Sequence, residues 1–261
     1  IDIFGICEGD GTLQGAIDAA EDGTSVIVPS GNYTESISIN KSLSVLCNGE
    51  CMIDAAGYAY GVTITGIDII LDGFEIVGDD STLSGVTIAN AQNVMVLNNQ
   101  IHGMALPNPS NISPASYGVL VYGGALDTNS NILIDGNEIY DVNLFGISLS
   151  QEVSGVVIMN NTIRDLKTLA VNPLQFAANT LGLDELDIEW WEDALDGTGI
   201  SVDDEHDVSV GIFAQGTAFY AAGNSFENVA FGVSSIVCAG EMEANTFDDA
   251  VYVHVLKITS V

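Results

Sequence analysis

The densest group of potentially reactive side chains lies at residues 203–207. It consists of Asp203, Asp204, Glu205, His206 and Asp207. Hydrolysis of a glycosidic bond requires two carboxyl groups at a suitable separation, and the neighbouring Trp190 or Trp191 offers a flat surface on which a sugar ring stacks. The simpler interpretation, which we favour, is a solvated acidic loop beside two aromatic residues that hold a helix in place.

Acidic pairs also suggest a metal. Ca²⁺ takes six to eight oxygen ligands, so Asp79 and Asp80, or the acidic group at 203–207, are candidate ligands. The sequence contains neither an EF-hand nor a nonapeptide calcium repeat. We therefore expect no cofactor other than such a structural Ca²⁺. His102 and His254 each lie alone in an expected strand, which favours a packed or surface residue over a metal ligand.

A repeated pattern shows which elements must position these residues. A glycine followed by alternating apolar residues recurs at Gly61, Gly85, Gly118, Gly146, Gly211 and Gly232, and each copy leads to a second short apolar run and a turn. An asparagine holds the same place in each of five turns: Asn99, Asn137, Asn161, Asn224 and Asn245. Apolar alternation predicts strands with one buried face, and stacked asparagines hydrogen-bond along the axis of a solenoid. The pattern predicts rungs of about 20–25 residues, each pairing with the next.

The beginning of the chain points to a particular solenoid. Residues 9–23 read as a short helix, and the apolar runs 25–28, 37–39 and 43–46 follow it. This arrangement resembles the opening of pectin-lyase-like right-handed parallel β-helix proteins, in which an amphipathic helix covers the first rung. We therefore expect an all-β fold: a single right-handed parallel β-helix domain over residues 1–261 with an N-terminal capping helix. An insertion at about 167–207 carries an acidic amphipathic helix near residues 183–195.

The catalytic motifs of that superfamily are absent. Gly31-Asn-Tyr-Thr-Glu35 matches the Gly-x-Tyr-x-Glu near the start of pectin methylesterases, but their paired aspartates and arginine have no counterpart. The polygalacturonase motifs are also missing, and Arg164-Asp-Leu-Lys167 is a poor match to the last of them. A pectate lyase needs several basic residues around its substrate, and the chain has one arginine. We expect a protein that is not an enzyme.

The charge excludes whole classes of partner. Thirty-six acidic residues face four basic ones, Lys41, Arg164, Lys167 and Lys257, so the net charge is −32. Phosphate binding requires clustered Lys and Arg, which excludes nucleic acid as a partner. No apolar run reaches the ~18 residues that a membrane-spanning helix needs, so we expect no membrane insertion. A neutral glycan remains a candidate ligand.

The four cysteines suggest contacts between copies. Cys7, Cys47 and Cys51 lie early in the expected solenoid, with Cys47 and Cys51 on either side of an Asn48-Gly49 turn, and Cys238 lies in a late rung. Rungs are about 4.8 Å apart, so Cys238 is too far from the others for the Cα separation of about 7 Å that a disulfide allows. At most one bridge forms among the first three. Cys238 and one early thiol are left for bridges between subunits.

The two ends of the sequence and its glycosylation motifs complete the interpretation. The chain starts at Ile1, as after removal of a secretory signal, and Asn-X-Ser/Thr motifs occur at Asn32, Asn40, Asn111 and Asn160. Residues 251–261 form a β-rich run whose edge invites pairing with another copy. We expect an extracellular or cell-surface structural protein that self-assembles through edge stacking and intersubunit disulfides into a layer, sheath or filament. In composition and architecture it is similar to surface-layer and sheath proteins of methanogenic archaea. The alternative is a secreted glycoside hydrolase or glycan-binding β-helix.

Overall fold

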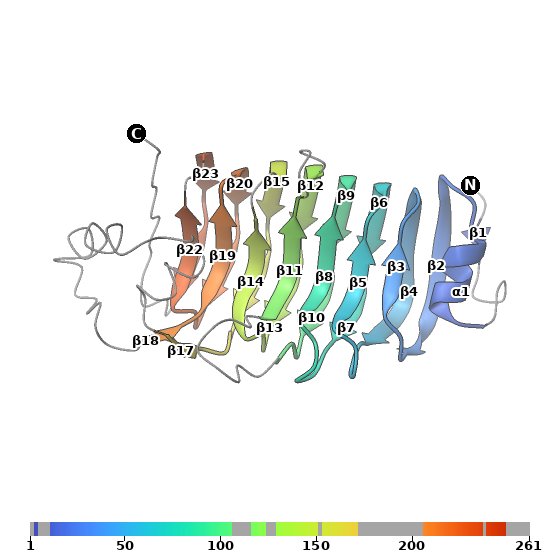
Figure 1. Ribbon diagram of the computed structural model, residues 1–261, viewed down its shortest axis with the longest axis horizontal. Helices are drawn as coiled ribbons and strands as arrows, with labels where there is room; N and C mark the ends of the chain where they lie inside the picture. The colour runs from blue at the N-terminus through green and yellow to red at the C-terminus, as the bar shows by residue number, and fades with distance from the viewer. Residues whose placement is uncertain are drawn as a thin grey trace.

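The protein is a stack of parallel rungs (Figure 1). The computed structural model describes residues 3–4, 11–105, 116–123, 129–150, 153–171, 206–236 and 239–248. Within these ranges every sheet pairing between rungs is parallel, and the rungs progress from the N-terminal end on the right of the view to the later strands on the left. The all-β parallel solenoid expected from the repeats is confirmed.

Three walls surround the core. The first wall is a seven-stranded sheet made of β3 (Ile37–Ile39), β5 (Tyr60–Ile64), β8 (Ser84–Ala89), β11 (Ser116–Tyr122), β14 (Leu144–Leu149), β19 (Val210–Gln215) and β22 (Phe231–Ile236). The second wall is made of β2 (Thr24–Tyr33), β4 (Leu43–Asp54), β6 (Ile67–Asp72), β9 (Gln92–Leu97), β12 (Asn129–Asp135), β15 (Val153–Met159), β20 (Ala218–Ala222) and β23 (Ala239–Glu243).

The third wall follows the asparagine turns. It is made of β7 (Glu75–Val77), β10 (Gln100–His102), β13 (Glu138–Tyr140), β16 (Thr162–Arg164), β21 (Ser225–Glu227) and β24 (Thr246–Asp248). The C-terminal half of β4 pairs with β7, so this strand serves both the second and third walls. Sequence reasoning expected a turn at Asn48-Gly49. Instead β4 runs through these residues, and the register against β2 shifts between Pro29 and Gly31.

The recurring glycines have a steric cause. They form a column along the first wall, opposite the inward apolar residues of the third wall. A Cβ on Gly146 would lie 2.6 Å from the carbonyl oxygen of Gly211 and 2.7 Å from Cγ2 of Ile163. Gly118 meets Gly146 and Ile139 in the same way, at 2.7 and 2.4 Å. The first and third walls can therefore pack this closely only where the first wall has a glycine at this position.

A helix covers the first rung, as expected, and its two ends are held by residues of that rung. Helix α1 (Leu13–Ala19) buries Leu13, Ala16 and Ile17 against the core. Thr12 is its N-cap and accepts a hydrogen bond from Gly15 N–H. Strand β1 (Ile3–Phe4) pairs with β2 beside this helix. In the insertion, β17 (Leu169–Val171) pairs antiparallel with β18 (His206–Val208), and the acidic helix expected at 183–195 lies outside the described residues.

Candidate functional site: side-chain ladders and outer faces

The five asparagines predicted to share one position form a continuous ladder, in which Asn99, Asn137, Asn161 and Asn224 are buried and Asn245 is half-buried. The Nδ2 and backbone N–H of Asn137 both donate to Oδ1 of Asn161, each at 2.9 Å. Asn161 makes the same two bonds to Asn224, at 3.0 Å each, and Asn224 makes them to Asn245, at 2.9 Å each. The second Nδ2 hydrogen reaches a carbonyl of the preceding rung, as from Asn161 to Ile134 at 2.9 Å. Each of the buried amides thus forms hydrogen bonds with the rungs on both sides of it, where water does not reach.

The ladder is preceded by apolar residues at the same position. Asn99 Oδ1 accepts from the N–H of Phe74 at 2.9 Å. Phe74 is 1% exposed and Cys51, one rung earlier, is 2% exposed. Cys51 forms a disulfide with Cys47 across a Cα–Cα separation of 5.9 Å. At the position of the asparagine ladder, the early rungs are therefore held by hydrophobic contact and a disulfide. The later rungs are held there by hydrogen bonds of the asparagine amides.

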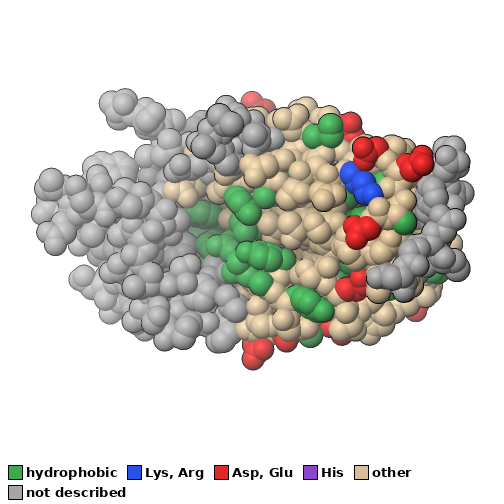
Figure 2. Space-filling model, turned by 45° about the vertical axis from the view of Figure 1, so that its right-hand side comes forward, with side chains coloured by type: hydrophobic (Ala, Val, Ile, Leu, Met, Phe, Trp, Pro, Cys, Tyr) green, Lys and Arg blue, Asp and Glu red, His purple; other side chains and the backbone are tan. Residues whose placement is uncertain are grey.

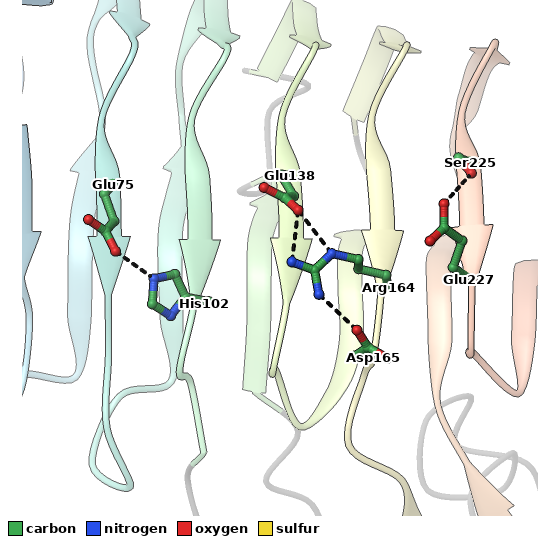
Figure 3. Close-up of polar contacts among 7 residues, drawn as sticks. All are labelled: Glu75, His102, Glu138, Arg164, Asp165, Ser225 and Glu227. Atoms are coloured by element: carbon green, nitrogen blue, oxygen red, sulfur yellow. Dashed lines mark hydrogen bonds and ion pairs between the residues drawn. The ribbon is translucent and has the colours of Figure 1, made fainter. Parts of the chain in front are cut away.

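A polar row runs along the outer face of the third wall (Figure 3). His102, Tyr140 and Arg164 lie on successive strands. The rings of His102 and Tyr140 stack with centroids 4.5 Å apart, and Arg164 Cζ lies 4.2 Å from the centroid of the Tyr140 ring. Nε2 of His102 lies 3.1 Å from Oε1 of Glu75. The row is a stack of cation–π and aromatic contacts along the solenoid axis.

Arg164 is also bound by carboxylates on either side. Its Nε and Nη2 lie 2.9 and 2.8 Å from Oε1 of Glu138, and its Nη1 lies 2.8 Å from Oδ2 of Asp165. These contacts raise the pKa of Arg164, the hydrogen bond with Asp165 most. The pKa of Asp165 is lowered, first by the amide of Asn228 and then by Arg164. Both groups are therefore held in their charged forms, which suits a structural ion pair rather than proton transfer.

The other described bases are used in the same manner. Lys167 Nζ lies 2.7 Å from Oδ1 of Asp141 on the neighbouring rung. Lys41 Nζ donates to the carbonyls of Asp18 and Ala20 at 2.8 and 2.7 Å, where helix α1 ends. A lysine at this position satisfies carbonyls that lack helical partners. All three bases in the described residues therefore stabilise the chain itself.

Asp79 is engaged by donors of its own turn. Its Oδ1 accepts from the N–H and hydroxyl of Ser81, at 2.9 and 2.5 Å, and from the hydroxyl of Thr82 at 3.3 Å. Its Oδ2 accepts from Gly57 N–H at 3.0 Å. These bonds, that from the Ser81 hydroxyl first, lower the pKa of Asp79. Both of its oxygens accept hydrogen bonds from donors of the chain, and this geometry suits a turn-forming role.

The outer face of the second wall carries a cluster of apolar side chains among polar ones. The alternation of burial along β6, β9, β12 and β15 turns every second side chain away from the core. We call six of these outward residues the apolar face: Ile70, Met95, Leu97, Leu133, Val157 and Met159. They occupy two adjoining rows, in which Ile70, Met95, Leu133 and Val157 follow one another in register. Met95 is 40% exposed, and the other five are half-buried.

Acidic side chains occur on more than one face of the molecule. Figure 2 shows another face, on which acidic side chains surround one basic side chain on the right and hydrophobic side chains gather near the middle. The apolar face holds Asp72 and Asp135 between its residues, and each carboxylate accepts a hydrogen bond of 2.9 Å from an asparagine amide, Asn98 or Asn160. These two rows therefore carry acidic side chains among the apolar ones.

Residues 49–256 match the family model described as "Right handed beta helix region". The chain belongs to the right-handed β-helix family. Over 92 residues, 34% of the chain, it is 36% identical to a "Cell surface glycoprotein" of Methanothermus fervidus, and the match spans 15% of that relative's length.

Solved structures resemble this β-helix at low identity. A GH136 lacto-N-biosidase from Eubacterium ramulus has a TM-score of 0.58 and 10% identity, with 94% of this chain and 56% of that chain covered. Pectate lyase Pel9A has a TM-score of 0.48 and 15% identity, with 90% of this chain and 68% of that chain covered. At 10% identity the likeness to the lacto-N-biosidase concerns the fold and says nothing about activity.

Several predicted site residues of this β-helix lie outside the described part. These are Cys7, Cys238, Asp203, Asp204 and Glu205, together with Trp190 and Trp191. Asp207 and His206 lie in β18, for which only the backbone is described. Among the described residues, no group of three or more His, Cys, Asp or Glu side chains is placed to hold a metal ion. No described helix has the length and apolarity to cross a bilayer.

Sequence reasoning missed the polar row and the apolar face. Which side chain lies above which depends on insertion lengths, so His102, Tyr140 and Arg164 are separated by 38 and 24 positions in the chain. The apolar face did leave a signal. Val94-Met-Val-Leu97 and Val156-Val-Ile-Met159 are continuous apolar runs, and such runs are typical of strands buried on both faces.

Proposed function

We propose that this protein is an extracellular structural protein whose copies assemble, by stacking of β-edges and by intersubunit disulfides, into a cell-envelope layer, sheath or filament. The observation that carries the proposal is the likeness of part of the chain to a cell surface glycoprotein. The regular rung structure supports it, because a solenoid whose units stack within one chain is well suited to stacking between chains.

The arrangement of charged groups supports a structural role over a catalytic one. A glycosidase needs one carboxyl group with a raised pKa to act as general acid. In the described residues the carboxyl pKa values that are displaced, those of Asp79 and Asp165, are lowered. Lys41, Arg164 and Lys167 are engaged by groups of the chain itself. These groups stabilise rungs and leave little free cationic surface for a uronate substrate.

The cysteines supply the proposed covalent link. Cys47 and Cys51 are bonded to each other within the chain. We assign the intersubunit bridges to Cys7 and Cys238, which belong to opposite ends of the sequence. A bridge from one copy's Cys7 to the next copy's Cys238 would fix a head-to-tail arrangement, and such a heterologous contact continues into rings or filaments.

Native material and the recombinant chain test the proposal together. Non-reducing gel electrophoresis is expected to show a ladder of covalent multimers that collapses on reduction, and negative-stain microscopy ordered layers, tubes or filaments. A Cys7→Ser/Cys238→Ser variant is expected to lose the ladder, whereas Cys47→Ser/Cys51→Ser is its matched control and keeps it. A protein that remains a non-covalent monomer in native material, or that cleaves a glycan, would contradict the proposed function.

A further inference from the structure

We propose that Asn32 and Asn40 carry N-linked oligosaccharides, which project from two corners of the first rung of the solenoid. Four Asn-X-Ser/Thr motifs occur in the chain, at Asn32, Asn40, Asn111 and Asn160, and this motif is the acceptor for N-linked sugars in exported proteins. The inference rests on the proposed extracellular function, because the sugar is transferred to exported chains. It adds which of the motifs are used.

Asn32 lies near the end of strand β2, where this strand borders the third wall. It is in register with Met52 of β4, which is in turn in register with Glu75, an outward residue of β7. Asn32 and Thr34, the first and third residues of the motif, are both exposed. Within the part of the chain that the structure describes, neither side chain makes a hydrogen bond. The amide and the hydroxyl of this motif are therefore both accessible from solvent.

Asn40 lies between β3 and β4, at the corner where the first wall leads into the second. The preceding residue, Ile39, is fully buried in the core, whereas Asn40 is exposed. Its side chain makes no hydrogen bond with the residues that the structure describes. The hydroxyl of Ser42, which completes the motif, donates to the carbonyl of Asp68 in the next rung at 3.3 Å. That contact involves only the hydroxyl, so the amide of Asn40 stays open to solvent.

The motif at Asn160 has a structural explanation instead. Asn160 has a φ of 52°, and its Nδ2 donates to Oδ1 of Asp135 at 2.9 Å. Its Oδ1 lies 2.7 Å from the position that a Cβ on Gly223 would take, so the side chain covers a glycine of the next rung. The following residue, Asn161, belongs to the asparagine ladder. Both asparagines of this motif are therefore needed by the fold.

A second turn of the solenoid has the same structure without the motif. Asn98 also has a φ of 52°, and its Nδ2 donates to Oδ1 of Asp72 at 2.9 Å. Its Oδ1 lies 2.7 Å from the position of a Cβ on Gly136. Gln100 stands two positions later, so this turn is not an acceptor. The turn thus requires asparagine for its own geometry. At the two proposed sites the asparagine has neither a positive φ nor a side-chain hydrogen bond to a described residue, so the fold does not account for it.

The transfer forms an N-glycosidic bond from an oligosaccharide carried on a lipid diphosphate. Nδ2 of the asparagine attacks the anomeric carbon, the C–O bond to the diphosphate breaks, and the lipid diphosphate leaves with the electron pair while the amide loses one proton. The exposed amides of Asn32 and Asn40 can enter a transferase site directly. That of Asn160 would first have to leave Asp135 and uncover Gly223. Transfer to the folded rungs therefore selects the first two sites over the third.

Peptide mapping of native material by mass spectrometry tests the assignment. The peptides that contain Asn32 and Asn40 are expected to carry sugar on the asparagine, and the peptide that contains Asn160 is expected to be unmodified. Variants made in the producing organism test the motif itself. Thr34→Ala is expected to abolish the sugar on Asn32, whereas Thr34→Ser, its matched control, keeps it. Ser42→Ala and Ser42→Thr form the corresponding pair for Asn40. Circular dichroism of each variant checks that the β-helix is retained.

Three results would overturn the inference. An unmodified peptide at either proposed site in native material removes that site. A sugar on Asn160 as complete as that on Asn32 shows that the fold does not select among the motifs. A sugar on Asn32 that survives Thr34→Ala shows that it is not attached through this motif. Failure of the proposed function is a separate result, the absence of covalent multimers and ordered layers, which non-reducing electrophoresis and microscopy score on the same material.

Discussion

The carboxylate of Glu35 accepts a hydrogen bond from the backbone N–H of Leu13, with 2.9 Å between Oε1 and the nitrogen. Its other oxygen accepts from the N–H of Gln14 at 3.0 Å. Leu13 is the first residue of helix α1, so a side chain from the first rung satisfies two of the donors that the helix leaves open. The helix that closes the core is thereby attached to the solenoid by charge as well as by apolar contact.

Glu35→Ala tests this attachment. The substitution leaves two backbone donors without their partner and removes a negative charge from the helix N-terminus. We expect the free energy of unfolding to fall by about 1–2 kcal/mol. Urea denaturation followed by circular dichroism measures it. Glu50→Ala removes an exposed carboxylate from the neighbouring strand β4 and serves as the control. Equal effects of the two substitutions would show that Glu35 does not anchor the helix.

Gly146→Ala tests the glycine column. The added methyl group would overlap the carbonyl oxygen of Gly211 and Cγ2 of Ile163, and neither the backbone nor the packed core can move without loss of contact. We expect a loss of about 2 kcal/mol or more in the free energy of unfolding, read from the same denaturation experiment. Thr63→Ala, an outward position on the first wall, provides the matched control and is expected to change stability by less than about 0.5 kcal/mol. A Gly146→Ala protein as stable as the wild type would contradict the steric explanation.

The fold was predictable because its signals are local and repeated. Each asparagine turn stands at a fixed distance from the apolar residues of its own rung. Asn137 and Asn161 could therefore be aligned from the residues of their own rungs alone. The capping helix was predictable for the same reason, since Thr12 and the apolar residues that follow it lie in one short segment.

The contacts between rungs were not predictable in the same way. Asn161 bonds to Asn224 across 63 positions and Asn224 to Asn245 across 21, because insertions separate some rungs and not others. The hydrogen-bonding partners of Glu35, Arg164 and Lys41 likewise depend on how neighbouring rungs are aligned. The disulfide between Cys47 and Cys51 was one of several pairings that the sequence allowed. The sequence therefore predicts which residues occupy equivalent positions in successive rungs. It does not predict which side chains contact one another between rungs.

Asn161→Ala tests the buried ladder at its middle. The substitution removes the acceptor for two bonds from Asn137 and the donor for bonds to Ile134 and Asn224. Because buried polar groups would lose their partners, we expect a loss of about 3 kcal/mol in the free energy of unfolding. Asn131→Gly is the control. It removes one exposed amide bond, to Asn93 at 3.1 Å, from a residue with φ of 55° that glycine adopts without strain. Comparable losses at the two positions would show that burial of the ladder contributes little.

Asp79→Asn tests the turn through its pH dependence. The lowered pKa of Asp79 means that its ionised form is favoured by folding. This stabilisation is fully present above the pKa of an unfolded aspartate, about 3.9, and is lost as the pH falls through the lower folded value. The difference in unfolding free energy between wild type and Asp79→Asn should therefore be largest near neutral pH and should shrink below about pH 4. Urea denaturation at a series of pH values measures this difference, and subtraction cancels the large common effect of the acidic surface. Asp80→Asn, the adjacent exposed aspartate, is the matched control. A difference for Asp79→Asn that stays constant through the acid range would show that the Ser81 and Gly57 donors do not stabilise the charged carboxylate.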